Sequence, residues 1–204
     1  MGALKWVVGP LIRGLSNGGL LFGMGFLSGN WIVALVLGLV GLGLGLVHGF
    51  AMAFGDCYDY SDGISWFKFI LDNTWSVTNS LAGSIYQTVN LIIFNPITQT
   101  GAGTGTVVHH RGVIPGYATT VGNVIASDDP GVQPHERLHV LQARIFGPLY
   151  LPLVIASYII GTVLPYWLIY HNYQRWPITS FGTYFMNGVY PHAWNEEWAY
   201  RTYP

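Results

Sequence analysis

The chain has 204 residues, of which 51% are hydrophobic, 15% aromatic and only 8% charged, and its formal net charge is −1. An ordinary soluble domain carries roughly 25% charged residues, so these charges are too few to cover a surface that faces water on all sides. The eight Lys and Arg residues are scattered, which argues against nucleic acid as a partner. The composition therefore predicts an integral membrane protein whose main partner is the lipid bilayer.

The first uncharged stretch covers residues 14 to 55, which contain no Asp, Glu, Lys or Arg. One membrane-spanning helix needs about 20 residues, so this stretch is long enough for a helical hairpin. We expect its arms at residues 6 to 27 and 31 to 54, with the break at Ser28-Gly29-Asn30. Glycines recur at four-residue spacing on the second arm and favour close helix packing: Gly41, Gly45 and Gly49.

The segments after the hairpin are mixed in character. Residues 66 to 71 are aromatic and apolar and suit a helix at the membrane interface. Residues 73 to 110 lack acidic and basic side chains, but Asn79 and Gln87 interrupt the apolar run. This segment spans the bilayer or lies against the other helices, and the total number of spans stays open between two and four.

A short β region precedes one further helix. Residues 106 to 114 and 117 to 126 are rich in β-branched residues and predict two strands joined at Pro115-Gly116. Asp128-Asp129-Pro130, followed by Pro134, indicates a helix start. Gly147-Pro148 ends that helix, which carries the residues of chemical interest.

The central motif of this helix is His135-Glu136-Arg137-Leu138-His139, an HExxH sequence. Residues four apart on a helix lie one turn above each other, so both imidazoles can bind one metal ion. Glu136 lies beside them, where it can take a proton from a water on the metal. Gln142 is on the same face and is a candidate supporting group for the ligands. The alternative is a helix whose histidines only satisfy local hydrogen bonds.

Two further elements resemble a family of bacterial HExxH membrane proteins. Residues 135 to 142 have the form HExxHxxQ and are followed by Gly147-Pro148-Leu149-Tyr150, while residues 194 to 199 contain Glu196 before Trp-Ala. The resemblance covers about residues 117 to 201. It implies a multi-pass protein of the bacterial inner membrane.

Two histidines and a distant glutamate also resemble the gluzincin metallopeptidases. That resemblance implies a zinc ion held by His135, His139 and Glu196, with Glu136 as the general base and a peptide as substrate. No residue that would stabilise the oxyanion is matched by motif. The candidates, on chemistry or proximity alone, are His192, Tyr200 and His109.

A shared site constrains how the chain runs between the motif and Glu196. If residues 147 to 170 crossed the bilayer completely, Glu196 would begin on the side opposite the histidines. We therefore expect residues 147 to 177 to form a bent or re-entrant pair that turns near residues 161 to 165.

His48 is the one histidine within the predicted hairpin. An ionisable side chain inside a membrane helix is often functional, so one interpretation of His48 is a ligand to the metal of a haem or a chlorophyll-type pigment. The alternative is a histidine that satisfies the packing of neighbouring helices.

The fold expected from these patterns is a mainly α integral membrane protein. Residues 1 to 55 form a transmembrane helical hairpin, and residues 56 to 204 form a zincin-like region with a small β-hairpin and the HExxH helix, together making one compact unit. The expected function is zinc-dependent hydrolysis. The competing interpretation is a non-catalytic subunit that associates with other subunits of a larger membrane complex.

Overall fold

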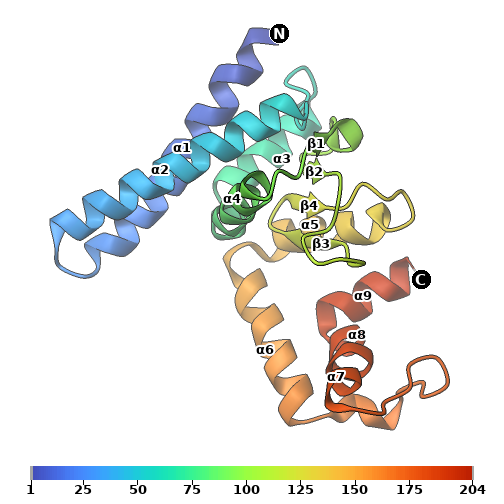
Figure 1. Cartoon of the computed structure of the whole chain (residues 1–204). Coiled ribbons are helices and arrows are strands. Elements are labelled where there is room, and N and C mark those ends of the chain that lie inside the picture. Colours follow the sequence, from blue (N-terminus) through green and yellow to red (C-terminus); the bar gives the residue numbers. More distant parts are fainter. Residues whose placement is uncertain (1, 204) are drawn as a thin grey trace. The chain divides into compact units, whose positions relative to one another are not determined.

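The computed structural model describes residues 2–203, which are mainly helical and include one small sheet (Figure 1). The chain divides into two compact units, Met1–Pro148 and Leu149–Pro204. The sequence placed a boundary near residue 55, whereas the division between the units falls after Pro148. The helical hairpin belongs to the first unit, together with the sheet and the HExxH helix.

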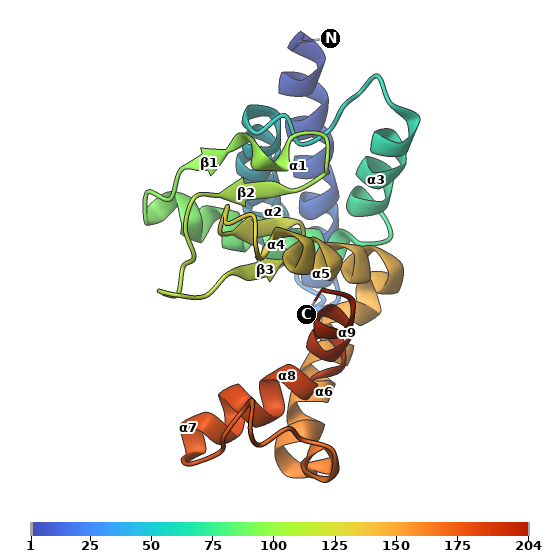
Figure 2. The ribbon, with the colours of Figure 1, turned by 90° about the vertical axis from the view of Figure 1, so that its right-hand side faces the viewer.

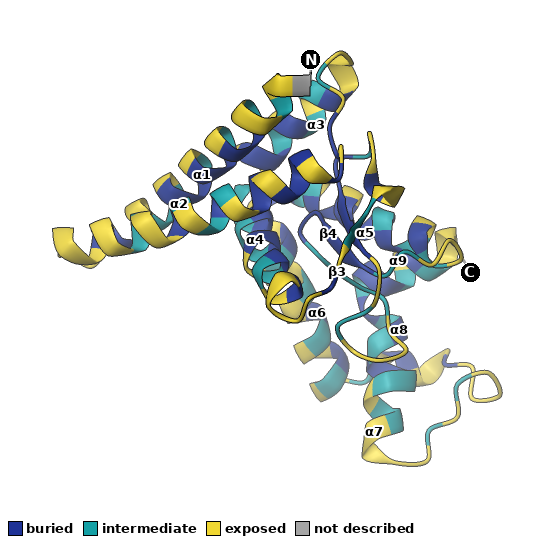
Figure 3. Cartoon of the chain, turned by 45° about the horizontal axis from the view of Figure 1, so that its top comes forward, coloured by how far each residue is buried: buried dark blue, intermediate teal, exposed yellow. Residues whose placement is uncertain are grey.

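The N-terminal hairpin consists of α1 (Gly2–Phe26) and α2 (Trp31–Phe54). Asn30 caps α2, because its side chain accepts hydrogen bonds from the backbone of Ile32 and Val33. Gly29 takes a φ of 73° in the turn, a conformation that glycine adopts without strain. Many apolar side chains along both helices are exposed (Figure 3). The predicted break and the second arm are therefore confirmed.

The two helices approach each other closely at the glycines of α2. A Cβ atom on Gly45 would lie 2.4 Å from the Arg13 carbonyl oxygen, and one on Gly49 would lie 2.3 Å from the Pro10 Cα. Atoms cannot come this close, so any larger residue forces the helices apart. The four-residue spacing of glycines serves packing within the hairpin itself.

The first testable prediction concerns this contact. Gly45→Ala is expected to lower the free energy of unfolding by about 1–3 kcal/mol, because the new methyl group has backbone rather than a flexible side chain against it. Gly43→Ala is the matched control, since a Cβ there meets nothing within 4 Å. Thermal unfolding in one detergent compares the three proteins. A Gly45→Ala variant as stable as the parent would contradict the close approach.

Two helical runs are long and apolar enough to cross a membrane by length and composition, Trp31–Phe54 and Gln133–Val163. The first of these is α2. The second run begins with the HExxH helix.

Arg13 lies on α1, and its side chain is fully buried and donates to the Asp72 carbonyl oxygen at 2.8 Å.

Two shorter helices pack between the hairpin and the sheet. In α3 (Gly63–Asn73), Phe69 and Asp72 are buried, so the helix expected at the interface turns one face into the core. α4 (Val77–Ile92) has 16 residues, which is shorter than a membrane span. Its buried face is polar and includes Asn79, Ser84 and Gln87. Of the two possibilities for residues 73 to 110, packing against the other helices is the one observed.

The sheet has four strands in the order β1-β2-β4-β3. Their bounds are Ile97–Thr98 for β1, Val107–His109 for β2, Thr119–Val121 for β3 and Val124–Ala126 for β4. β4 pairs with β3 in antiparallel fashion and with β2 in parallel fashion, and β1 pairs antiparallel to β2.

The predicted hairpin at Pro115-Gly116 is wrong. The tight turn instead joins β3 to β4 at Gly122-Asn123, where Gly122 has a φ of 61°. A two-residue turn needs such positive φ values, and glycine at the first turn position provides one. Residues 110 to 118 form a loop that brings β4 beside β2 in the same direction, which a direct hairpin cannot do.

The sheet separates two apolar clusters within the first unit. Val107 and Val124 contribute to the larger cluster, which also contains Met52, Tyr58 and Phe69. Their neighbours Val108 and Ile125 point to the other face and pack against Val140 of α5 (Gln133–Phe146). Successive strand residues point to opposite faces, so these short strands anchor α5 on one side of the sheet (Figure 2).

The second unit begins with α6 (Tyr150–Val163), which follows a short 3₁₀ segment, η2 (Gly147–Leu149). The later elements are η3 (Tyr166–Ile169), α7 (Phe181–Thr183), a π-helical segment η4 (Tyr184–Val189), α8 (Tyr190–His192) and α9 (Trp194–Thr202). The Trp194 amide donates to the Ser157 hydroxyl at 2.9 Å, and the Tyr184 hydroxyl donates to the Thr162 carbonyl at 2.8 Å. The chain thus turns after Val163 and returns along α6, as expected from Gly161 and Pro165.

Candidate metal site

The HExxH helix, α5, begins and ends where its sequence predicts. Pro134 stands in the first turn, and the Gln133 amide donates to the Asp129 carbonyl at 3.2 Å. At the other end Gly147 has a φ of 53°, which stops the helix. The motif therefore lies entirely on one regular helix.

His135 and His139 form a pair on this helix. Their ring centroids are 4.9 Å apart and the ring planes meet at 77°. The Nδ1 atom of His139 lies 3.0 Å from Oε1 of Gln142. An amide oxygen only accepts, so Nδ1 carries the proton and Nε2 keeps a lone pair. Gln142 thus sets the tautomer that a metal ligand needs.

Glu136 contacts the sheet rather than a second helix. The Thr120 hydroxyl donates to Oε2 of Glu136 at 2.6 Å. Thr120 is on β3, the edge strand, and its neighbour Thr119 points instead to the Tyr86 hydroxyl. No sequence pattern pointed to Thr120, because the contact depends on β3 lying beside α5. The Thr120 hydroxyl thereby ties the Glu136 carboxylate to the edge strand.

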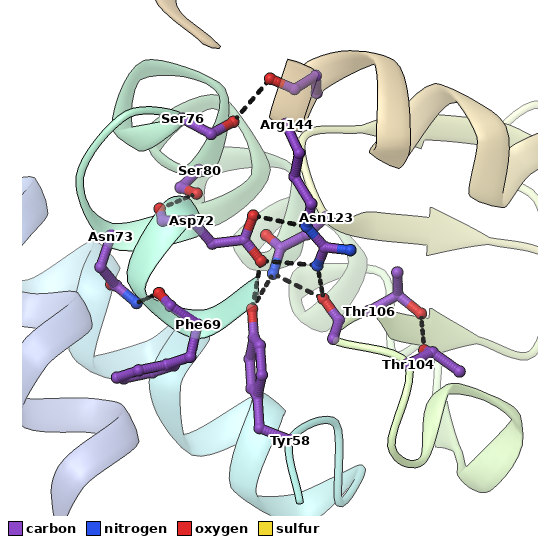
Figure 4. Close-up of polar contacts among 12 residues, drawn as sticks. Tyr58, Phe69, Asp72, Asn73, Ser76, Ser80, Thr104, Thr106, Asn123 and Arg144 are labelled. Atoms are coloured by element: carbon purple, nitrogen blue, oxygen red, sulfur yellow. Dashed lines mark hydrogen bonds and ion pairs between the residues drawn. The ribbon is translucent and has the colours of Figure 1, made fainter. Parts of the chain in front are cut away.

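A buried ion pair fixes the far end of α5 (Figure 4). Arg144 donates to both carboxylate oxygens of Asp72, at 2.9 and 2.7 Å, and to the Gly105 carbonyl at 2.9 Å. The Tyr58 hydroxyl donates to the same carboxylate at 2.5 Å. Burial, together with the neighbouring Asp72 charge, raises the pKa of Tyr58 well above its ordinary value, so this hydroxyl stays protonated and donates.

The last carbonyl groups of α5 are also occupied. Side chains at the start of α4 donate to them: Ser76 to Ala143 at 3.0 Å, Asn79 to Gly147 at 2.7 Å and Trp75 to Ile145 at 3.2 Å. Helix carbonyls at this end have no partner within the helix, so these contacts satisfy them. The histidine pair is consequently carried on a helix fixed at both its sheet face and its C-terminal end.

Glu196 lies in the first turn of α9, in the second unit. The Asn195 side chain donates to its Oε1 atom at 3.0 Å. The imidazoles of His135 and His139 and the carboxylate of Glu196 are donor types that bind metal ions. The structure places the two histidines on α5 in the first unit and the Glu196 carboxylate on α9 in the second unit.

Two further histidines of the first unit have partners of their own. His109 shares the sheet face of Val107, and its ring nitrogens lie 2.8 Å from the Asn95 carbonyl and 2.8 Å from the Gln87 side chain on α4. Burial lowers its pKa below the ordinary histidine value. It points away from α5, and its candidacy as an oxyanion stabiliser is wrong for this reason. His110 pairs with Asp128.

His48 and His192 occupy separate places. His48 is fully buried, and its Nδ1 atom lies 2.8 Å from the Ser84 hydroxyl on α4, a contact between packed helices. His192 is in the second unit, where its Nδ1 atom lies 2.7 Å from the Gly188 carbonyl. Burial lowers the pKa of His192 below the ordinary histidine value.

Comparison with known proteins adds nothing to this description: no family model, no curated protein and no solved structure matches the chain.

Proposed function

We propose that the chain is a membrane-bound zinc hydrolase of the metallopeptidase kind. The observation that carries the proposal is the arrangement on α5, where the rings of His135 and His139 meet edge-to-face one turn apart and the Glu136 carboxylate accepts from Thr120 of the edge strand. Two imidazole ligands one turn apart, with an adjacent carboxylate as general base, are typical of hydrolytic zinc sites.

The residues present suit zinc. The Gln142 contact leaves the Nε2 lone pair of His139 for a metal, which is the ligand form of histidine. We propose Glu196 of α9 as the third ligand. Three protein ligands would leave the fourth tetrahedral position open, which distinguishes catalytic from structural zinc sites.

The protein groups define the rest of the proposed reaction. Bound zinc would supply an acidified water and polarise the scissile carbonyl. Glu136 accepts the proton of the attacking water and returns it to the leaving amine. Thr120 holds Glu136 in position through its hydroxyl. The open edge of β3 pairs with an extended peptide through backbone hydrogen bonds. We assign the oxyanion contact to a group of the second unit, His192 or Tyr200.

The proposed location is a membrane, with the bacterial inner membrane following from the family resemblance. The support is the apolar exterior of the hairpin: Leu27 is 87% and Trp31 68% exposed at its tip. Such side chains are stable in lipid rather than in water. We propose that α1 and α2 insert together, which makes the protein multi-pass.

Metal content is the test of this proposal. The purified parent is expected to hold about one zinc per chain, since one His/His/Glu set is proposed. His139→Ala and Glu196→Ala are each expected to lose most of it, and elemental mass spectrometry measures the ratio of zinc to protein. His110→Ala is the matched control, because that exposed histidine pairs with Asp128.

Each result has a defined consequence. Zinc retained in Glu196→Ala but lost in His139→Ala would remove Glu196 from the ligand set. A parent that takes up no zinc, even when zinc is supplied, would contradict the hydrolase proposal.

A structural subunit is the second candidate function. One face of the hairpin favours it, because a Cβ atom on Gly19 or Gly23 of α1 meets nothing within 4 Å. Nearby, an apolar groove of about 330 Å³ is lined by residues of both helices, including Phe22 and Leu39. Small residues on an open helix face suit another transmembrane helix. Zinc with four protein ligands and no exchangeable position would favour this candidate over the hydrolase.

A further inference from the structure

The second unit contains a pocket of about 240 Å³ formed by residues of the loop after η3 and of α8 and α9. Two guanidinium groups, one carboxylate and aromatic rings line it, and those that matter here are Arg175, Trp176, His192, Glu197, Tyr200 and Arg201. All belong to the same compact unit. The pocket is therefore defined without reference to the first unit.

The loop that carries Arg175 is held in a fixed shape. The Asn172 side-chain oxygen accepts from the amides of Gln174 and Arg175 at 3.1 and 3.0 Å, and the Asn172 carbonyl accepts from the Trp176 amide at 2.9 Å. His171 donates through Nε2 to the Trp176 carbonyl at 2.7 Å. These bonds keep Arg175 and Trp176 at the pocket wall.

The two arginines are in different electrostatic situations. Arg201 is paired with Glu197 at 2.5 Å on the exposed side of α9. Arg175 lies over the Trp176 ring at 5.5 Å and forms no ion pair among residues 2–203. A guanidinium group on an aromatic face still presents its N–H edge to a carboxylate. The charged side chains of the pocket, Arg175, Arg201 and Glu197, sum to one net positive charge. Burial lowers the pKa of His192 below the ordinary histidine value.

The remaining wall is aromatic. The rings of Trp176 and Tyr200 are 6.1 Å apart and meet at 62°, which leaves apolar surface facing the same space as the arginines. A ligand with one anionic group and a flat or branched apolar group matches both surfaces. Two carboxylate oxygens fit the paired donors of a guanidinium group, whereas a neutral amide does not.

We propose that this pocket binds the free carboxylate end of a peptide, with Arg175 as its principal partner and the Trp176 and Tyr200 rings against the terminal side chain. The connection to catalysis rests on the function proposed above. Glu196 directly precedes Glu197 on α9, and Tyr200 lies one helical turn further, so one wall of the pocket is the helix that carries the proposed third metal ligand. The substrate class is then a short peptide cut near its C-terminus.

A binding experiment with a simple probe tests the pocket. We would titrate the purified parent with 3-phenylpropanoate and with 3-phenylpropanamide, which has the same ring but no charge, and follow heat by calorimetry. The acid is expected to bind roughly tenfold more tightly, since a charge-assisted hydrogen bond is stronger than a neutral one. Neither probe has a peptide bond, so hydrolysis does not interfere.

Variants locate the binding. Arg175→Gln is expected to abolish the preference for the acid while leaving amide binding within about twofold, and Lys68→Gln on α3 is the control that should change neither. Glu197→Gln should strengthen acid binding, because it releases Arg201. Equal affinity for acid and amide would overturn the proposal. So would an acid preference that survives in Arg175→Gln, since the carboxylate would then be bound elsewhere, for example on a metal ion.

The outcomes separate this pocket from the proposed function. A parent without zinc that still prefers the acid in an Arg175-dependent way supports the pocket and removes only its link to hydrolysis. A zinc-containing parent that binds acid and amide equally removes the pocket and leaves the hydrolase proposal standing. The acid titration is repeated with added vesicles. If phosphatidylglycerol vesicles abolish binding of the acid to the protein and phosphatidylcholine vesicles do not, the pocket is reassigned to a lipid headgroup and the peptide assignment is overturned.

Discussion

Glu136→Gln is expected to reduce peptide hydrolysis by about 10²–10⁴-fold while the zinc content stays at the parent level. The amide keeps the size and the Thr120 contact of the carboxylate, but it cannot accept the proton of the attacking water. Hydrolysis of a quenched-fluorescent peptide mixture gives the rate, and elemental mass spectrometry on the same sample gives the zinc. This pairing separates loss of the base from loss of the metal.

Two further variants define what the result means. Asp128→Asn removes a half-buried carboxylate that pairs with the exposed His110, and it should leave the rate within about twofold of the parent. Thr120→Val removes only the hydroxyl that positions Glu136, so kcat should fall by less than in Glu136→Gln while KM and zinc stay unchanged. A Glu136→Gln protein as active as the parent would exclude Glu136 as the general base.

The second large effect concerns the ion pair that fixes α5. Asp72→Asn is expected to lower the free energy of unfolding by about 3–5 kcal/mol, because it leaves the Arg144 guanidinium buried without a counter-charge. The side chains of Asp72 and Arg144 are only 3% and 10% exposed, so water cannot replace the lost carboxylate. Chemical denaturation in one detergent measures the change.

The control is an ion pair of the same type on the surface. Asp56→Asn breaks the contact between Asp56, whose side chain is 52% exposed, and Lys5, whose side chain is 23% exposed. It should lower the free energy of unfolding by about 0–1 kcal/mol. In the double variant of Asp72→Asn with Arg144→Gln, the unpaired charge is gone, so its loss should be smaller than the sum of the two single losses. An Asp72→Asn protein that loses less than about 1 kcal/mol would show that the pair does not fix the helix.

Local patterns were enough to place several elements. The uncharged run of residues 14 to 55 and the break at Ser28-Gly29-Asn30 located α1 and α2, and α2 has the predicted bounds. Proline at the start and glycine at the end located α5. Signals of this kind act within a few residues of chain, through composition, capping and backbone conformation, so they can be read without knowing the fold.

The strands show where local patterns fail. Two β-branched runs separated by Pro115-Gly116 suggested a simple hairpin, yet the structure pairs β2 with β4 in parallel and turns at Gly122. Strand partners are chosen by packing of both sheet faces, here the Met52 and Tyr58 cluster on one side and Val140 on the other. That choice involves residues far apart in sequence, and a turn signal alone does not contain it.

The sequence by itself determined the motif: the spacing of His135 and His139 places both rings on one face of a helix wherever that helix lies. Only the tertiary structure decided what surrounds them. The Thr120 contact of Glu136 and the Asp72 contact of Arg144 join residues 16 and 72 positions apart, and the same packing turned His109 toward α4 and away from the motif. Helical periodicity is a property of neighbouring residues, whereas these contacts arise when the core closes around the sheet.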